Sequence, residues 1–167
     1  LAAGLSVALI SDAGTPLVSD PGYKLARAAI AAGHTVRCLP GPSAVLAGLA
    51  VSGLATDTFL FAGFLPVKPG ARRARLAELA PVPATLIFYE SAGRAAATLA
   101  EMAAGLGADR EAALAREMTK RFEEVRRGSL ASLAAGAVAD RPRGEIVILV
   151  GPQPAREVAD ADIATRL

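Results

Sequence analysis

A loop rich in glycine, proline and hydroxyl-bearing residues, from Ser11 to Gly22, is the part of the sequence best suited to bind a ligand. Gly14 would let a ligand approach the backbone closely, and the N–H groups of such a loop can donate hydrogen bonds to a carboxylate or a ribose. A second group of donors is expected where Ser43 caps a helix. The loop could equally be a tight strand-to-helix turn in which Asp20 caps a helix that begins at Pro21.

The chain contains a single histidine and a single cysteine, which makes several kinds of catalytic and metal site improbable. His34 lies in a sequence typical of a solvated turn, and Cys38 lies in a short apolar stretch typical of a buried strand. A disulfide framework, a zinc site and a Ser-His-Asp triad therefore lack their parts. The carboxylates are scattered and not clustered at ligand spacing, so we expect no metal site.

Two clusters of basic residues could neutralise phosphates, although the net charge is only +2 and the pI is about 9.0. Either cluster could also be an ordinary solvated surface. The first contains Lys68, Arg72, Arg73 and Arg75, and the second contains Lys120, Arg121, Arg126 and Arg127.

Strands and helices that alternate along the chain must position these residues. Of the 167 residues, 53% are hydrophobic, which is enough to bury a core, and the alternation predicts an α/β fold. The predicted strands are 6–10, 35–39, 58–64, 85–89, 112–115 and 145–150, with 122–127 extended. The predicted helices are 21–32, 43–51, 71–80, 94–105 and 130–139.

The turn Pro40-Gly41-Pro42 is rigid and suits a domain junction. We expect residues 1–41 to be the C-terminal part of a first α/β domain, truncated at its N-terminus. Residues 42–151 would form a second α/β domain, and 152–167 a C-terminal tail. No apolar stretch reaches the roughly 20 residues of a membrane span, and no signal peptide is recognisable, so a cytoplasmic protein is expected.

Five motifs occur in the order found in the tetrapyrrole methylase superfamily. More narrowly, the chain resembles the branch of that superfamily that methylates the 2′-oxygen of a cytidine ribose in 16S ribosomal RNA. The resemblance covers about residues 1–151. The motifs are Ser11–Tyr23, Pro40–Ala44, Gly63–Pro66, Phe88–Ser91 and Arg116–Lys120.

The resemblance implies an enzyme of two α/β domains that binds S-adenosylmethionine in the cleft between them and is usually a homodimer. By the family's pattern, the backbone of Ala13, Gly14 and Thr15 would contact the methionine end of the cofactor. Val18 would pack nearby.

The same pattern implies four further contacts with the cofactor. Ser43 and Ala44 would meet it from the start of the next helix, while Glu90 and Met118 would line its adenosine side. The partner would be small-subunit ribosomal RNA or the 30S subunit.

Methyl transfer from a sulfonium depends above all on positioning, and a general base is helpful without being obligatory. Polar groups near the expected cleft are Asp12, Glu90, Glu117 and Lys120, and none of them is assigned as the base. A structural ion pair of Glu117 is slightly favoured over a catalytic role. The candidates for RNA contacts are Arg72, Arg73, Arg75 and Lys120.

Two departures from the family's pattern leave alternatives open. The opening strand of the family and its loop are absent, and a Glu-Ser-Pro-His-Arg pattern is replaced by the sequence Glu90 to Arg94, with Ala92 and Gly93 in the middle. A porphyrinoid C-methyltransferase is one alternative, although its loop would typically contain Gly-Gly-Asp-Pro. A non-catalytic module that binds RNA or dimerises is the other.

Overall fold

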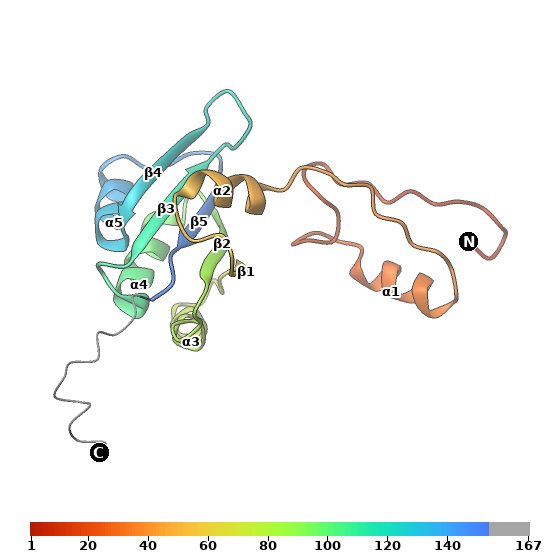
Figure 1. Ribbon diagram of the computed structural model, residues 1–167, viewed down its shortest axis with the longest axis horizontal. Helices are drawn as coiled ribbons and strands as arrows, with labels where there is room; N and C mark the ends of the chain where they lie inside the picture. The colour runs from red at the N-terminus through yellow and green to blue at the C-terminus, as the bar shows by residue number, and fades with distance from the viewer. Residues whose placement is uncertain (154–167) are drawn as a thin grey trace, which may run out of the picture.

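The computed structural model describes residues 1–153, and its centre is one mixed sheet of five strands in the order β1-β2-β5-β3-β4. β1 is parallel to β2, and the other three pairings are antiparallel. β5 comes last in the sequence and lies in the middle of the sheet (Figure 1). The strands are β1 (Phe59–Phe64), β2 (Thr85–Ser91), β3 (Glu111–Arg116), β4 (Glu124–Ser129) and β5 (Glu145–Val150).

Helices cover both faces of this sheet. Because side chains alternate along a strand, Leu86 and Phe88 of β2 face one helical layer, whereas Ile87 faces the other. Among the described residues, the first layer contains three helices, and α2 packs on the opposite face (Figure 1). The helices of the first layer are α3 (Pro69–Leu79), α4 (Ala95–Leu106) and α5 (Leu130–Ala139), and α2 spans Ala44–Ser52.

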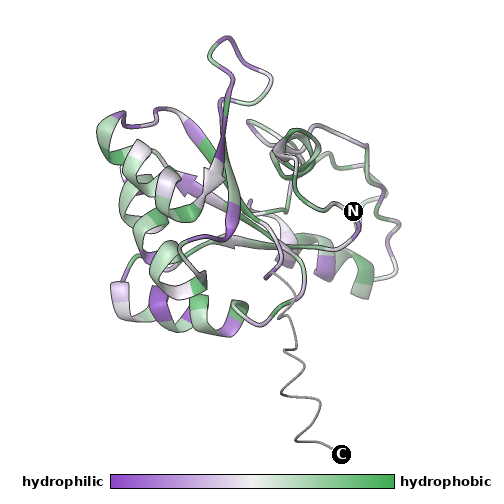
Figure 2. Cartoon of the chain, turned by 60° about the vertical axis from the view of Figure 1, so that its left-hand side comes forward, coloured by the Kyte–Doolittle hydropathy of each residue, from purple (hydrophilic) through white to green (hydrophobic). Residues whose placement is uncertain are grey.

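The first 41 residues form an arm that extends from the sheet and carries one helix, α1 (Tyr23–Ala31) (Figure 1). The strands predicted at 6–10 and 35–39 are wrong as elements of this structure, since neither pairs with a strand among the described residues. A strand needs a neighbour to bond its backbone N–H and C=O groups. Hydrophobic residues of the arm remain exposed, and so does Cys38. Figure 2 shows that much of the arm is hydrophobic in sequence.

Most other elements agree closely with the sequence-based prediction. The strand 145–150 and the helix 130–139 have the predicted bounds, and the extended segment predicted at 122–127 is β4, which begins at Glu124. The predicted division at 41/42 stays a prediction, and the predicted tail lies outside the described residues from 154 onward. No helix within residues 1–153 is long and apolar enough to cross a membrane.

Candidate active site

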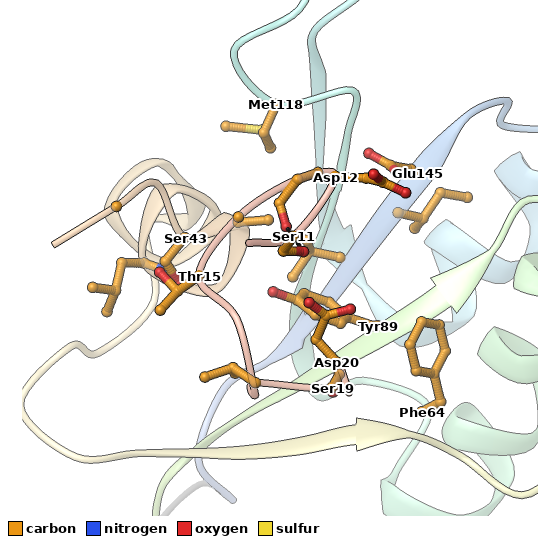
Figure 3. A pocket seen from close by; sticks show the side chains of 18 of the residues that line it. Ser11, Asp12, Thr15, Ser19, Asp20, Ser43, Phe64, Tyr89, Met118 and Glu145 are labelled. Carbon is orange, nitrogen blue, oxygen red and sulfur yellow. Dashed lines mark hydrogen bonds between the residues drawn. The ribbon is translucent and has the colours of Figure 1, made fainter. Parts of the chain in front are cut away.

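A cavity of about 970 Å³ lies where the arm meets the sheet (Figure 3). Its size suits a small-molecule ligand. The cavity brings together parts of the chain that are far apart in sequence. They are the Ser11 to Gly22 loop, the start of α2, and one end of the strands β1, β2 and β5. Its walls come from residues within 9–21 and 38–46, from Phe64, from 89–92, from Met118 and from 144–147.

The predicted cofactor loop forms one wall of this cavity. Gly14 has φ +70°, a conformation that L side chains rarely adopt, and Thr15 Oγ1 donates a hydrogen bond to the carbonyl of Pro42 over 3.2 Å. This bond joins the loop before α1 to the turn before α2. Ala13 and Val18 also line the cavity, so all four predicted loop residues lie on its wall.

Backbone conformation is unusual further along the same loop. Leu17 and Ser19 have φ of 74° and 58°, although neither is a glycine. Such strained residues cluster at functional sites.

The expected cap of α1 by Asp20 is wrong, because α1 begins after Gly22 and no side chain caps it. The Asp20 side chain instead lies at the cavity, beside Tyr89 (Figure 3).

The start of α2 supplies a second wall. Ser43 is confirmed as the cap of this helix, since its Oγ accepts a hydrogen bond from the N–H of Leu46 over 3.5 Å. Ser43 and Ala44 both line the cavity. Next to them, burial raises the pKa of the Tyr89 hydroxyl, an effect that a hydrogen bond from the Val45 backbone partly offsets.

Glu90 lines the cavity, but its carboxylate belongs to the opposite face of the sheet. It accepts hydrogen bonds from Thr98 Oγ1 and from the Ser91 N–H, each over 2.7 Å, and lies 3.2 Å from the Arg94 guanidinium. The Glu90 side chain is 1% exposed. Met118, by contrast, lies on the cavity wall and packs against the cluster around α2. Of these two predicted adenosine-side residues, only Met118 faces the α2 side of the sheet.

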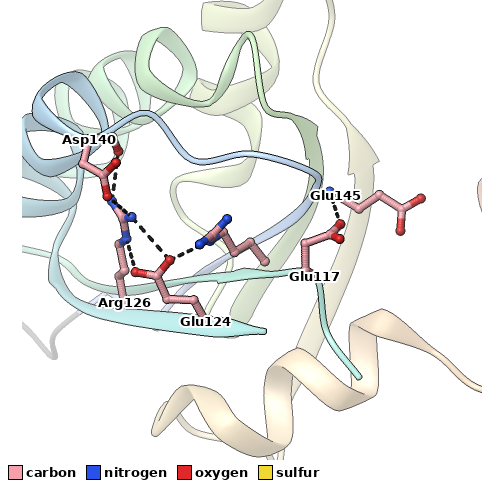
Figure 4. A network of polar contacts seen from close by, with 6 residues as sticks. Glu117, Glu124, Arg126, Asp140 and Glu145 are labelled. Carbon is pink, nitrogen blue, oxygen red and sulfur yellow. Dashed lines mark hydrogen bonds and ion pairs between the residues drawn. The ribbon is translucent and has the colours of Figure 1, made fainter. Parts of the chain in front are cut away.

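Glu117 holds a turn together at the edge of the cavity (Figure 4). Its Oε1 accepts the Glu145 N–H over 2.9 Å, which is the main reason that the pKa of this carboxyl lies below its usual value. Lys120 lies 2.7 Å from the Glu145 carboxylate and 3.4 Å from that of Glu117. A Cβ at Gly144 would overlap the Glu117 carboxylate. These contacts give Glu117 a structural role and leave Lys120 about half exposed.

The basic residues predicted to contact RNA differ in how accessible they are. Arg72 is 6% exposed, and two of its nitrogens bond to Glu101 over 2.8 and 2.6 Å. Arg73 is exposed, and Arg75 is an exposed residue paired with Glu78. The Arg72 guanidinium therefore fastens α3 to α4 and is not presented to a surface ligand.

Two arginines of the second basic cluster are also committed to contacts within the fold. Arg126 pairs with both Glu124 and Asp140, and Glu124 pairs in turn with Arg116 over 2.6 Å (Figure 4). Arg127 instead donates to the carbonyls at the end of α2. These contacts hold β4 to the elements around it.

Sequence reasoning did not single out Tyr89, Phe64 or residues 144–147 as parts of the site. Tyr89 and Phe64 lie inside motifs that the sequence did identify, and the alternation of side chains in β2 was the available signal for Tyr89. Residues 144–147 reach the cavity because β5 pairs with β2, which the sequence does not disclose.

The Arg72–Glu101 pair predicts a pH dependence of stability. Arg72 lowers the pKa of Glu101 below its usual 4.5, chiefly through their hydrogen bond. A carboxyl whose pKa is lowered in the folded state stabilises the fold above its unfolded-state pKa, and that contribution disappears as the pH falls through the folded-state pKa. We therefore expect Glu101→Gln to reduce the free energy of unfolding at about pH 7 more than at about pH 4. Urea unfolding at several pH values measures this, and a pH-independent difference would contradict it.

The sequence of this chain matches a known protein family and several curated proteins. A family model described as tetrapyrrole (corrin/porphyrin) methylases matches residues 1–134. Ribosomal RNA small subunit methyltransferase I of Mesorhizobium japonicum is 59% identical over 164 residues, which cover 98% of this chain and 56% of that protein. The protein of that name from Xylella fastidiosa is 52% identical, over 98% of this chain and 59% of its own length. The chain thus spans a little more than half the length of these curated relatives.

Solved structures show the same fold. The methyltransferase CobJ is 26% identical, with a TM-score of 0.59 over 87% of this chain and 64% of its own. Uroporphyrin-III C-methyltransferase from Thermus thermophilus, solved as a complex with S-adenosylhomocysteine, is 24% identical, with a TM-score of 0.56 over 83% of this chain and 62% of its own.

Proposed function

This chain belongs to the tetrapyrrole methylase family, and we propose that it forms the S-adenosylmethionine site of a methyltransferase acting on small-subunit ribosomal RNA. The reaction would be methylation of the 2′-oxygen of a cytidine ribose. The observation that carries the proposal is one cavity that gathers the Gly14 loop, the Ser43 helix start and Met118 from three separate motifs. The names of the relatives in Mesorhizobium japonicum and Xylella fastidiosa support small-subunit ribosomal RNA as the acceptor.

The residues present fit such a cofactor. Gly14 keeps the loop free of a side chain at a position of positive φ, and the capped start of α2 points N–H groups toward the same space. Ala13, Gly14 and Thr15 would hold the methionine end, and Met118 the adenosine side. When bound, S-adenosylmethionine supplies an electrophilic methyl group.

The chain's own contribution to the reaction is positioning. The walls of the cavity hold the reacting groups in a near-attack arrangement, which by itself accounts for a large part of a rate enhancement. Glu90 and Glu117 are committed to hydrogen bonds within the fold, so neither is proposed as a base. The other carboxylates on the cavity wall belong to Asp12, Asp20 and Glu145, of which Glu145 pairs with Lys120. No catalytic residue is assigned.

Contacts with RNA would come from the exposed basic residues Arg73, Arg75 and Lys120, and we withdraw Arg72 from this set because it is buried against Glu101. We further propose that the enzyme is cytoplasmic, where ribosomal subunits are assembled, and that it is a homodimer.

Two measurements test the proposal: one asks whether the protein binds the cofactor, and the other asks which molecule accepts the methyl group. S-adenosylmethionine and S-adenosylhomocysteine are titrated calorimetrically into this chain and into a version extended to the length of the Mesorhizobium japonicum relative. Labelled methyl transfer is then measured on 30S subunits and on a uroporphyrinoid. We expect binding by the extended protein and transfer to 30S subunits alone. Transfer to the porphyrinoid alone would overturn the RNA assignment, and no cofactor binding by either protein would overturn the whole proposal.

A further inference from the structure

A β-bulge near the end of β1 turns one aromatic side chain toward the cavity. Phe61 pairs with Ile87, but the next pairs are Gly63 with Phe88 and Phe64 with Tyr89, so β1 contains one extra residue. Residues directly opposite each other share a face of the sheet, and a shift of one residue exchanges the faces. Without the bulge, Phe64 would point into the α3 and α4 layer; with it, Phe64 lies on the same face as Tyr89.

The Phe64 ring is held in place while much of it remains open. Tyr89 contacts it edge to face, with ring centroids 5.6 Å apart and an interplanar angle of 62°. Tyr89 is in turn fixed against Phe61 at 4.8 Å. Phe64 is nevertheless 56% exposed, whereas Leu65, the next residue, is 3% exposed. The cavity therefore has a rigid, uncovered aromatic ring on its wall (Figure 3).

We propose that the Phe64 ring is the platform on which the base of the acceptor nucleotide stacks. This inference rests on the proposed function and adds a substrate-positioning residue to it. Proteins that recognise unpaired RNA bases stack them on aromatic side chains, because every base offers a π-face. A base on Phe64 would leave its ribose directed into the cavity, where the 2′-oxygen must meet the methyl group.

The placement of Phe64 favours the acceptor over the cofactor as the stacking partner. Thr15 and Ser43, which are assigned to the cofactor, lie close together on one side of the cavity (Figure 3). Phe64 lies apart from them, beyond Tyr89 and Asp20. The two ends of the cavity thus suit two different molecules.

A tryptophan at position 64 provides a direct test, because these 167 residues contain none and the segments added in the extended protein are chosen to contain none. Phe64→Trp in the extended protein is titrated with a short cytidine-containing RNA in the presence of S-adenosylhomocysteine. Stacking of the base should quench the tryptophan fluorescence. The matched control is Phe59→Trp, since Phe59 is 41% exposed, lies at the other end of the same strand and is not part of the cavity wall. Quenching of the Phe64→Trp variant by S-adenosylhomocysteine alone, or equal quenching of both variants by the RNA, would overturn the inference.

Methyl transfer gives a second readout in the same protein. Phe64→Leu should raise KM for the RNA about tenfold, as expected from the loss of one stacked base, with cofactor affinity unchanged. Phe64→Tyr should restore the wild-type KM. An unchanged KM in Phe64→Leu would overturn the stacking role even though the wild type methylates RNA. A wild type that methylates no RNA would instead count against the proposed function, while the fluorescence titration still reports on Phe64.

Discussion

Gly14→Val should weaken binding of S-adenosylmethionine by more than about 100-fold while leaving the sheet folded. Gly14 has φ +70°, where an ordinary residue costs about 1–2 kcal/mol, and a β-branched side chain fits worst. The loop would have to shift, which would displace the backbone N–H groups proposed to bind the methionine end of the cofactor; a hydrogen bond to a charged group contributes about 1.5–3 kcal/mol. Loss of two such hydrogen bonds, about 3 kcal/mol or more, exceeds the 2.8 kcal/mol or so that corresponds to 100-fold.

Gly33→Val is the matched control for this prediction. Gly33 has φ +77°, lies on the same arm, and has open space around the position of a Cβ. It is not part of the cavity wall. Both variants therefore carry the same backbone penalty, and only Gly14→Val should lose cofactor affinity in a calorimetric titration of the extended protein. Equal affinities in two folded variants would show that the cofactor does not contact the Gly14 loop.

Glu90→Ala should lower the free energy of unfolding by about 3 kcal/mol, as expected when one partner of a buried ion pair is removed. The Thr98 hydroxyl would lose its acceptor, and the Arg94 guanidinium its carboxylate. Thr98 is 1% exposed, so water does not replace its lost bond, and Arg94 Nε is buried and already has no hydrogen-bond partner among the described residues. Urea unfolding followed by circular dichroism measures the change.

Two comparisons make this prediction specific. Glu145→Ala removes a carboxylate that is 74% exposed and pairs with Lys120, so it should change stability by less than about 1 kcal/mol. Glu90→Ala should also leave cofactor affinity of the folded protein unchanged, because the carboxylate points away from the cavity. A stable Glu90→Ala variant that no longer binds cofactor would contradict the structural role given to Glu90.

The sequence predicts the sheet and its helices well where hydrophobic periodicity is strong, as in 130–139 and 145–150. It fails at 6–10 and 35–39 for a physical reason. Those segments are apolar enough for buried strands, but a strand exists only when a neighbour bonds its backbone, and periodicity does not reveal neighbours.

The candidate site was predictable to a similar extent. Its loop and helix start follow from local residue types, which is why Gly14 and Ser43 were found. The orientation of Glu90 could have been predicted as well, because alternation from Phe88 through Tyr89 places its side chain on the helix face. The pairing of Arg72 with Glu101, 29 residues away, depends on how α3 packs on α4 and has no local signal.

The central position of β5 determines when the sheet can be completed during synthesis. β1 can pair with β2, and β3 with β4, before β5 exists, but nothing bonds one pair to the other until residues 145–150 arrive between them. Ribosomes add about 5–20 residues per second, so the inner edges of β2 and β3 remain open for a time on the order of seconds. Open strand edges invite pairing with other chains. The nascent protein is therefore most vulnerable to aggregation just before β5 emerges, and the arrival of that strand closes both open edges at once.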